Sequence, residues 1–166
     1  TNERSDVDLS LYLADSSGLP YGEPLKTVTL SEDEITGQPQ NVPFNIELEA
    51  ATYILAVMPK NLVKRYDDNG YTWPRASMAG AKCLYKYPTG EWTVQNGLAL
   101  WLGINYLSAQ EQGSGEGESY VLDYTFENVN NGLELNVGFA GGFEARYQSF
   151  TPQVDANLRK VSFVMF

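Results

Sequence analysis

What the sequence lacks excludes several kinds of site. It contains no histidine and a single cysteine in 166 residues. Without histidine, the common serine and cysteine hydrolase pairs have no base, and zinc and iron sites lose their most frequent ligand. The one cysteine, Cys83, has no partner for an internal disulfide and lies in an alternating segment, which favours a buried strand residue over a nucleophile. The sequence therefore predicts no catalytic residue, no metal site and no cofactor.

Positive charge is also scarce. Lysine and arginine number 11 against 21 aspartates and glutamates, a formal net charge of -10. A field of this sign repels polyanions, so neither nucleic acid nor an anionic membrane is expected as a partner. No apolar run approaches the roughly 20 residues that a spanning helix needs, and Thr1–Leu9 has no hydrophobic signal region. We therefore expect no membrane insertion.

Apolar and polar residues alternate along most of the chain, and no stretch of eleven or more residues keeps a helical stripe. Two such runs, Tyr120–Phe126 and Leu133–Phe139, flank turn residues at Asn128–Gly132 and predict a hairpin. Short alternating runs separated by turn signals are typical of sandwiches. The pattern predicts one all-β domain over residues 1–166, an antiparallel β-sandwich or jelly roll of roughly ten strands with little or no helix.

Several segments carry more specific expectations. Thr52–Met58 is apolar on both faces and is predicted to be buried from both sides, or to have its second face under a loop. Leu98–Leu107 reads as one long strand at the centre of a sheet, with Gly103 as a bulge or a position of close approach. Pro43 places its strand at a sheet edge, or at a position whose amide faces out, because proline cannot donate to the ladder. The segment Ser31–Ile35 predicts a single helical turn, capped by its first residue.

The order of motifs in the chain carries a resemblance. They run as VDLSLYLADSSGLPYGEPL from Val7, then VPFNIELEAATYILAV, YTWPR, GEWT and LALWLG, with QSFTP at Gln148–Pro152 and LRKVSFVMF at the end. This set resembles the choice-of-anchor β-sandwich modules of phage tail and baseplate proteins and of exported bacterial surface proteins. The resemblance implies a structural or adhesion role in a virion or at the cell surface. Its expected partners are other copies of the chain, in a homo-oligomer, or other virion and surface proteins.

The chain departs from the family order in one respect. QSFTP stands near the end of the chain instead of before Val7, so the family order would run through residues 120–166 and then 1–107. Between these parts, Ser108–Ser119 has the Gly, Ser, Gln and Glu composition of a flexible connector. A natural circular permutation, an engineered one and a coincidence of strand patterns all remain open. Permutation predicts that the two ends of the chain meet as adjacent antiparallel strands of an opened hairpin.

Acidic clusters give weak signals. Asp67, Asp68, Asn69 and Gly70 superficially resemble an oxygen-rich calcium loop, but the full ligand spacing is absent, so a solvated turn is expected. Glu32–Glu34 is likewise expected to be solvated. No carboxylate pair is marked out by local sequence for glycoside cleavage. These observations favour a protein without enzymatic activity.

Aromatic residues form the strongest candidate site. They concentrate with polar residues in the loop-rich middle of the chain, and sugars are recognised by flat aromatic faces beside planar polar groups. The alternative is that the two tryptophans of this set plug the sandwich as core residues, whereas Tyr66, Tyr71 and Arg75 are expected to be exposed. The candidate carbohydrate-binding residues are Tyr66, Asp67, Asn69, Tyr71, Trp73, Arg75 and Trp92.

The leading functional prediction is a non-enzymatic β-sandwich module that acts in assembly or adhesion. One alternative is a carbohydrate-binding module that uses the aromatic loop residues to hold a glycan. A second is a fimbrial subunit completed by strand exchange, which the alternating VSFVMF from Val161 to Phe166 suggests.

Overall fold

The computed structural model describes residues 5–61, 71–86, 90, 92–100, 102–108, 121–122, 134–137, 145–152 and 155–163. Within these ranges the chain forms strands and one short 3-10 helix, which confirms the predicted all-β class. The elements are β1 (Val7–Ala14), β2 (Pro20–Leu30), η1 (Glu32–Glu34), β3 (Gln40–Leu48), β4 (Tyr53–Pro59), β5 (Tyr71–Lys86), β6 (Trp92–Leu100), β7 (Leu102–Ser108), β8 (Val121–Leu122), β9 (Glu134–Val137), β10 (Ala145–Phe150) and β11 (Ala156–Phe163).

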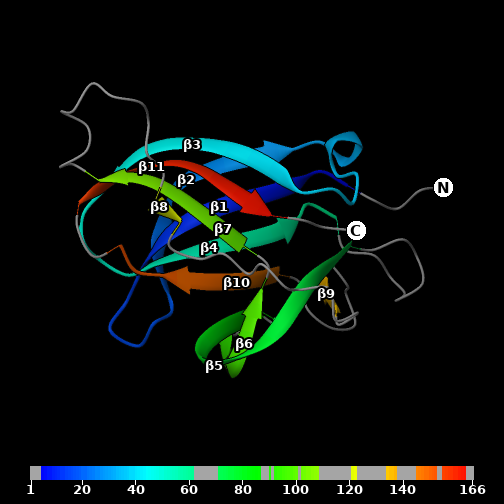
Figure 1. Cartoon of the computed structure of the whole chain (residues 1–166). Coiled ribbons are helices and arrows are strands. Elements are labelled where there is room, and N and C mark those ends of the chain that lie inside the picture. The colour runs from blue at the N-terminus through cyan, green and yellow to red at the C-terminus, as the bar shows by residue number, and fades with distance from the viewer. Residues whose placement is uncertain are drawn as a thin grey trace.

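The strands form two antiparallel sheets. The seven-stranded sheet has the order β2-β1-β4-β10-β5-β6, with β9 paired to β5, and the four-stranded sheet has the order β3-β11-β7-β8. Figure 1 shows the four-stranded sheet stacked on the part of the larger sheet that β2, β1 and β4 form. The protein is therefore an antiparallel β-sandwich, as the sequence predicted.

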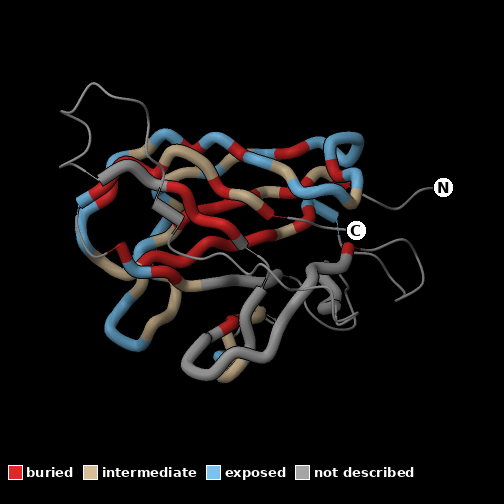
Figure 2. Tube along the Cα trace, in the orientation of Figure 1, coloured by how far each residue is buried: buried red, intermediate tan, exposed pale blue. Residues whose placement is uncertain are grey.

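The core lies between the two sheets and is built by residues from both. Figure 2 shows buried residues along strands of both sheets. Leu9 and Leu11 of β1 face Phe44 of β3 and Phe163 of β11, and all four are 0% exposed. Burying a side chain of this kind stabilises the fold by about 1.5–3 kcal/mol. Cys83 on β5 is also 0% exposed, which confirms the prediction of a buried strand cysteine.

Strand β4 is buried on both faces, as predicted. Its residues Tyr53, Leu55 and Val57 belong to the core between the sheets. Ile54 and Ala56 point to the opposite side of the seven-stranded sheet, where they form a second apolar cluster with Leu84.

Strand β3 lies at the edge of the four-stranded sheet, as Pro43 predicted. The neighbouring Asn45 has a φ of 48°, in the left-handed region that asparagine tolerates better than most residues. Before β3, the predicted turn at Ser31 forms as η1. The Ser31 backbone N–H and hydroxyl donate to the Glu34 carboxylate at 2.8 and 3.1 Å.

The prediction of one strand over Leu98–Leu107 is wrong. β6 ends at Leu100 and lies at the edge of the seven-stranded sheet, whereas β7 begins at Leu102 and lies inside the four-stranded sheet. A continuous apolar run predicts burial on both faces, but it carries no signal of a change of sheet. The bulge predicted at Gly103 is also misplaced, because the register between β7 and β11 shifts between Leu158 and Lys160.

Most of the predicted hairpin after residue 120, including the residues that would pair its two strands, lies outside the described ranges. β8 pairs with β7 in the four-stranded sheet, whereas β9 pairs with β5. Alternation predicted that both segments are strands but did not determine their partners, since pairing depends on the rest of the sheet. The turn residues at Asn128–Gly132 and the connector residues 109–119 lie outside the described ranges.

The two ends of the chain do not form adjacent strands, so that prediction is wrong. β1 pairs with β2 and β4, and β11 pairs with β3 and β7, so the two strands belong to opposite sheets. Figure 1 shows that β1 begins and β11 ends toward the same end of the sandwich. A direct link between them would pass from one sheet to the other instead of forming a hairpin. Residues 1–4 and 164–166 lie outside the described ranges.

Candidate interaction surface

The structure does not describe the side chains of five of the seven predicted carbohydrate-binding residues. Tyr66, Asp67 and Asn69 lie outside the described residues. Trp73 and Arg75 lie on β5, where their backbones pair with Leu135 and Leu100 respectively, and their side chains are outside the description.

The expectation that Tyr71 is exposed is wrong. Its side chain is 2% exposed and belongs to the core between the sheets. Its hydroxyl donates a hydrogen bond of 2.7 Å to the carbonyl oxygen of Ser5. Tyr71 is the first residue of β5, so a segment that the sequence suggested to be a loop instead enters the sheet. Tyr71 therefore has a structural role and offers no face to a sugar.

Trp92 covers the second apolar cluster. Its partly buried ring packs against the cluster of Ile54, Ala56 and Leu84. It opposes Lys86 across the β5–β6 pair, and the Lys86 ammonium nitrogen lies 5.4 Å from the ring centroid. A cation at this distance is attracted to the ring face. Trp92 and Tyr71 thus pack in different clusters, and the structure does not bring them together into one surface.

The exposed apolar residues gather on the β1–β2 hairpin. Among large hydrophobic side chains of the described residues, Tyr21 is 66% exposed, Leu25 49% and Leu13 36%, and the fourth, Val94 on β6, is 37% exposed. Leu13 is the register partner of Tyr21 on one side and of Tyr53 on the other. Tyr53 in turn opposes Phe150 on β10. We call these four residues, Tyr21, Leu13, Tyr53 and Phe150, the aromatic row.

The aromatic row runs from the sheet edge into the core. Tyr53 and Phe150 are buried and stack with ring centroids 5.9 Å apart and an interplanar angle of 29°. The Tyr53 hydroxyl donates to the Glu49 carbonyl oxygen at 2.9 Å. At the hairpin turn, the Asp15 carboxylate accepts backbone N–H groups of Ser17 and Leu19 at 2.8 and 3.0 Å. The exposed part of the row is thus attached to an ordered turn and a packed core.

Two carboxylates lie near the buried part of the aromatic row. Burial raises the pKa of Tyr53, and the negative charges of Glu49 and Asp155 raise it further, although the hydrogen bond to the Glu49 carbonyl lowers it. Burial also raises the pKa of Tyr12, and the charge of Glu23 adds to that shift, but Tyr12 packs against the second apolar cluster on the opposite face of the sheet. Glu49 and Asp155 are therefore the carboxylates that these effects place close to the row.

The sequence did not predict this surface. Tyr21 lies in DSSGLPYGEP, a segment that the glycines and prolines mark as a turn. The available signal was an aromatic residue between Pro20 and Gly22, where a turn has no core to receive it. The pairing of Tyr21 with Leu13 and Tyr53 requires the strand register, which the sequence does not determine.

Among the described residues, no group of three or more His, Cys, Asp or Glu side chains could hold a metal ion. In the same part of the chain, no helix is long and apolar enough to cross a membrane. Comparison with known proteins finds no matching family model, no matching curated protein and no matching solved structure. Fold and surface therefore define the protein as an antiparallel β-sandwich with an exposed aromatic and aliphatic patch at one end.

Proposed function

We propose that this chain is a non-enzymatic β-sandwich module that acts in assembly or adhesion within a phage virion or an exported surface protein. The observation that carries the proposal is the aromatic row. Tyr21 and Leu13 are exposed neighbours on a sheet whose next two strands bury Tyr53 and Phe150. An exposed patch that continues a packed core is a suitable contact surface for another macromolecule.

The energetics of such a patch favour binding. Tyrosine has few rotatable bonds, so ordering its ring in an interface costs little entropy while it contributes a large contact area. The stacked Tyr53 and Phe150 pair supports the neighbouring strands. A partner would therefore meet a surface that is already ordered, which lowers the cost of association.

Two of the sheet edges favour contact through side chains over strand addition. β2 and β3 are edge strands, and both contain residues that oppose pairing with a further strand. β2 contains Pro20 and Pro24, and β3 contains Pro43 and the left-handed Asn45. Because the prolines and Asn45 hinder backbone pairing at these edges, a partner is expected to contact the exposed side chains instead.

The strand-exchange alternative receives less support. Val161 and Phe163 of β11 are 0% exposed, and β11 is already paired on both sides, with β3 and β7. The C-terminal strand thus completes its own sandwich, whereas a fimbrial subunit would need a partner's strand to do so.

The carbohydrate alternative rests on Trp92. This is the one predicted site residue with a described side chain that is still partly accessible, and Lys86 lies over its ring. A sugar at this position would have to share the ring with the ammonium group. For this reason the aromatic row is the better supported surface.

The virion or surface location rests on the order of the sequence motifs, and microscopy tests it. Antibody raised against the folded chain and coupled to gold should label intact particles, or the outside of intact cells, from the source that carries the protein. Label confined to the interior of cells would contradict the proposal. Pre-absorption of the antibody with the purified chain is the control for specificity.

A further inference from the structure

We propose that the aromatic row binds a segment of a second protein in which arginine or lysine stands beside aromatic or aliphatic side chains. This inference rests on the proposed function and specifies the partner's chemistry. It follows from an apolar centre and an acidic surround at the same end of the sandwich.

The apolar centre is contiguous. Tyr21 and Leu13 are direct cross-strand partners, and side chains in such a pair lie about 4.5–5.5 Å apart at Cβ. Leu13 has Tyr53 as its partner on the other strand. The exposed ring and aliphatic chain are therefore one patch and not scattered surface residues. A matching patch requires an apolar group on the partner.

Three exposed carboxylates lie at this end, each from a different segment. Asp15 lies in the turn between β1 and β2, whereas Glu49 after β3 and Asp155 before β11 lie near the Tyr53 hydroxyl. The Asp155 carboxylate accepts the Ala50 backbone N–H at 2.9 Å, which fixes it beside Glu49. The partly buried Lys26 is the register partner of Leu11, the residue two positions before Leu13 on β1. Negative charge from Asp15, Glu49 and Asp155 therefore borders the row.

This combination selects a cationic partner. A guanidinium or ammonium group can lie over an exposed tyrosine ring and also pair with a carboxylate at this end of the sandwich. A second copy of the chain would bring like charges together at the contact, which costs free energy, and the chain's net charge of -10 adds to the repulsion. Charge complementarity therefore favours a different, basic protein over self-association through this surface.

Three hexapeptide amides test the proposal against the full chain by isothermal titration calorimetry. The first alternates arginine and tryptophan, the second arginine and serine, and the third glutamate and tryptophan. The proposal predicts that the first binds at least about tenfold more tightly than the other two, because it alone supplies both charge and apolar contact. Equal binding of the first two would overturn it, because attraction to net charge alone would explain such a result.

Two pairs of matched variants locate the binding. Tyr21→Ser should weaken binding of the arginine–tryptophan peptide by about five- to tenfold. Val94→Ser removes an apolar side chain of 37% exposure from β6, at the other edge of the same sheet, and should leave binding unchanged. Circular dichroism and thermal melting check that both variants fold. Equal effects of the two substitutions would overturn the assignment to the aromatic row.

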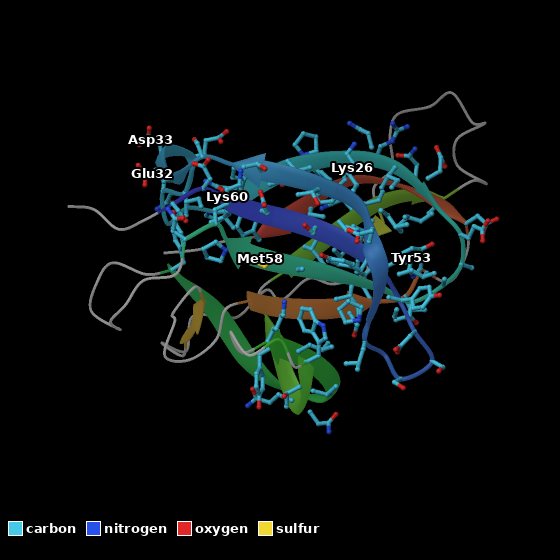
Figure 3. The ribbon with its side chains drawn as sticks, turned by 180° about the vertical axis from the view of Figure 1, so that it is seen from behind. Lys26, Glu32, Asp33, Tyr53, Met58 and Lys60 are labelled. Atoms are coloured by element: carbon cyan, nitrogen blue, oxygen red, sulfur yellow. The ribbon has the colours of Figure 1, made fainter. Side chains whose placement is uncertain are left out.

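The second pair of variants removes two negative charges each, from opposite ends of the sandwich. Figure 3 shows Tyr53 at one end of the sandwich and Glu32 and Asp33 at the other. The double variant Glu49→Gln/Asp155→Asn should weaken binding several-fold more than Glu32→Gln/Asp33→Asn. Equal loss in both would refute a local acidic surround. If no peptide binds while gold label is found on particles or cell surfaces, this inference fails and the proposed function stands.

Discussion

The phenol of Tyr71 and the backbone carbonyl of Ser5 are joined by a buried hydrogen bond of 2.7 Å across 66 residues of sequence. The bond connects the start of β5 to the residues that lead into β1. Ser5 also accepts the Asn61 backbone N–H through its hydroxyl at 2.9 Å. Ser5, which leads into β1, is thus hydrogen-bonded to both segments that flank residues 62–70, at Asn61 and at Tyr71.

Tyr71→Phe should destabilise the fold by about 1–2 kcal/mol, because it removes a donor from a buried carbonyl. Urea denaturation monitored by fluorescence measures the change. Tyr21→Phe is the matched control, since the same hydroxyl is removed from a ring that is 66% exposed. Equal stability of the two variants would show that the Tyr71 bond contributes nothing.

Substitution of Asn45 should reveal the strained backbone of β3. At its φ of 48°, Asn45→Val should cost about 1–2 kcal/mol, because a β-branched side chain is unfavourable there. Asn45→Gly should change stability by less than about 0.5 kcal/mol. Because the Asn45 side chain is exposed, neither the valine nor the glycine substitution should lose much packing. If both variants unfolded at the same urea concentration, backbone conformation would not be the cause.

High pH should destabilise the protein partly through Tyr53. Burial first, and then Glu49 and Asp155, raise the pKa of Tyr53 above its ordinary value of 10.0. The folded state therefore keeps this proton where the unfolded state has lost it. The resulting stabilisation is complete below pH 10 and is lost as the pH rises through 10 toward the folded pKa.

The measurement is the free energy of unfolding from pH 8 to pH 11. Its decline should be less steep in Tyr53→Phe than in the unaltered chain. Tyr21→Phe controls for removal of a phenol at an exposed position. Parallel curves for the unaltered chain and Tyr53→Phe would contradict the attribution to Tyr53.

Trp92→Ala separates packing from sugar binding. Because the ring covers Ile54, Ala56 and Leu84, its loss should cost about 2 kcal/mol, below the range for a fully buried aromatic residue. The proposed function predicts no glycan binding by either protein on an array. Binding by the unaltered chain that Trp92→Ala abolishes would instead favour the carbohydrate alternative. Thermal melting would confirm that the variant is folded at the array temperature.

The sequence predicted the fold where local patterns determine structure. The alternation in Val42–Leu48 predicted a strand with one buried face, Pro43 favoured an edge position for it, and the apolar Thr52–Met58 predicted a strand buried on both sides. The prediction from sequence failed where segments far apart in the chain determine which strands pair. The run from Leu98 changes sheets, and β8 and β9 take separate partners. Neither outcome alters the local pattern of apolar residues.

The candidate site was predicted less well than the fold. Tyr71 lies among glycine and charged residues, so it read as a loop aromatic, but the long strand β5 carries it into the core. Tyr21 lies in a turn-like segment and instead extends a row that begins at Phe150. In both cases the sequence shows the residue type, whereas exposure depends on which strands lie beside it.

Site-specific photo-cross-linking tests most directly whether the aromatic row contacts a partner. A photoreactive phenylalanine would replace Tyr21 in the chain within its intact particle or surface assembly, and Val94 in a parallel sample. The account predicts a cross-link from position 21 to one identified protein of the assembly, at a lysine- or arginine-containing segment, and none from position 94. Equal cross-linking from both positions, or none from position 21 in the assembled state, would contradict it.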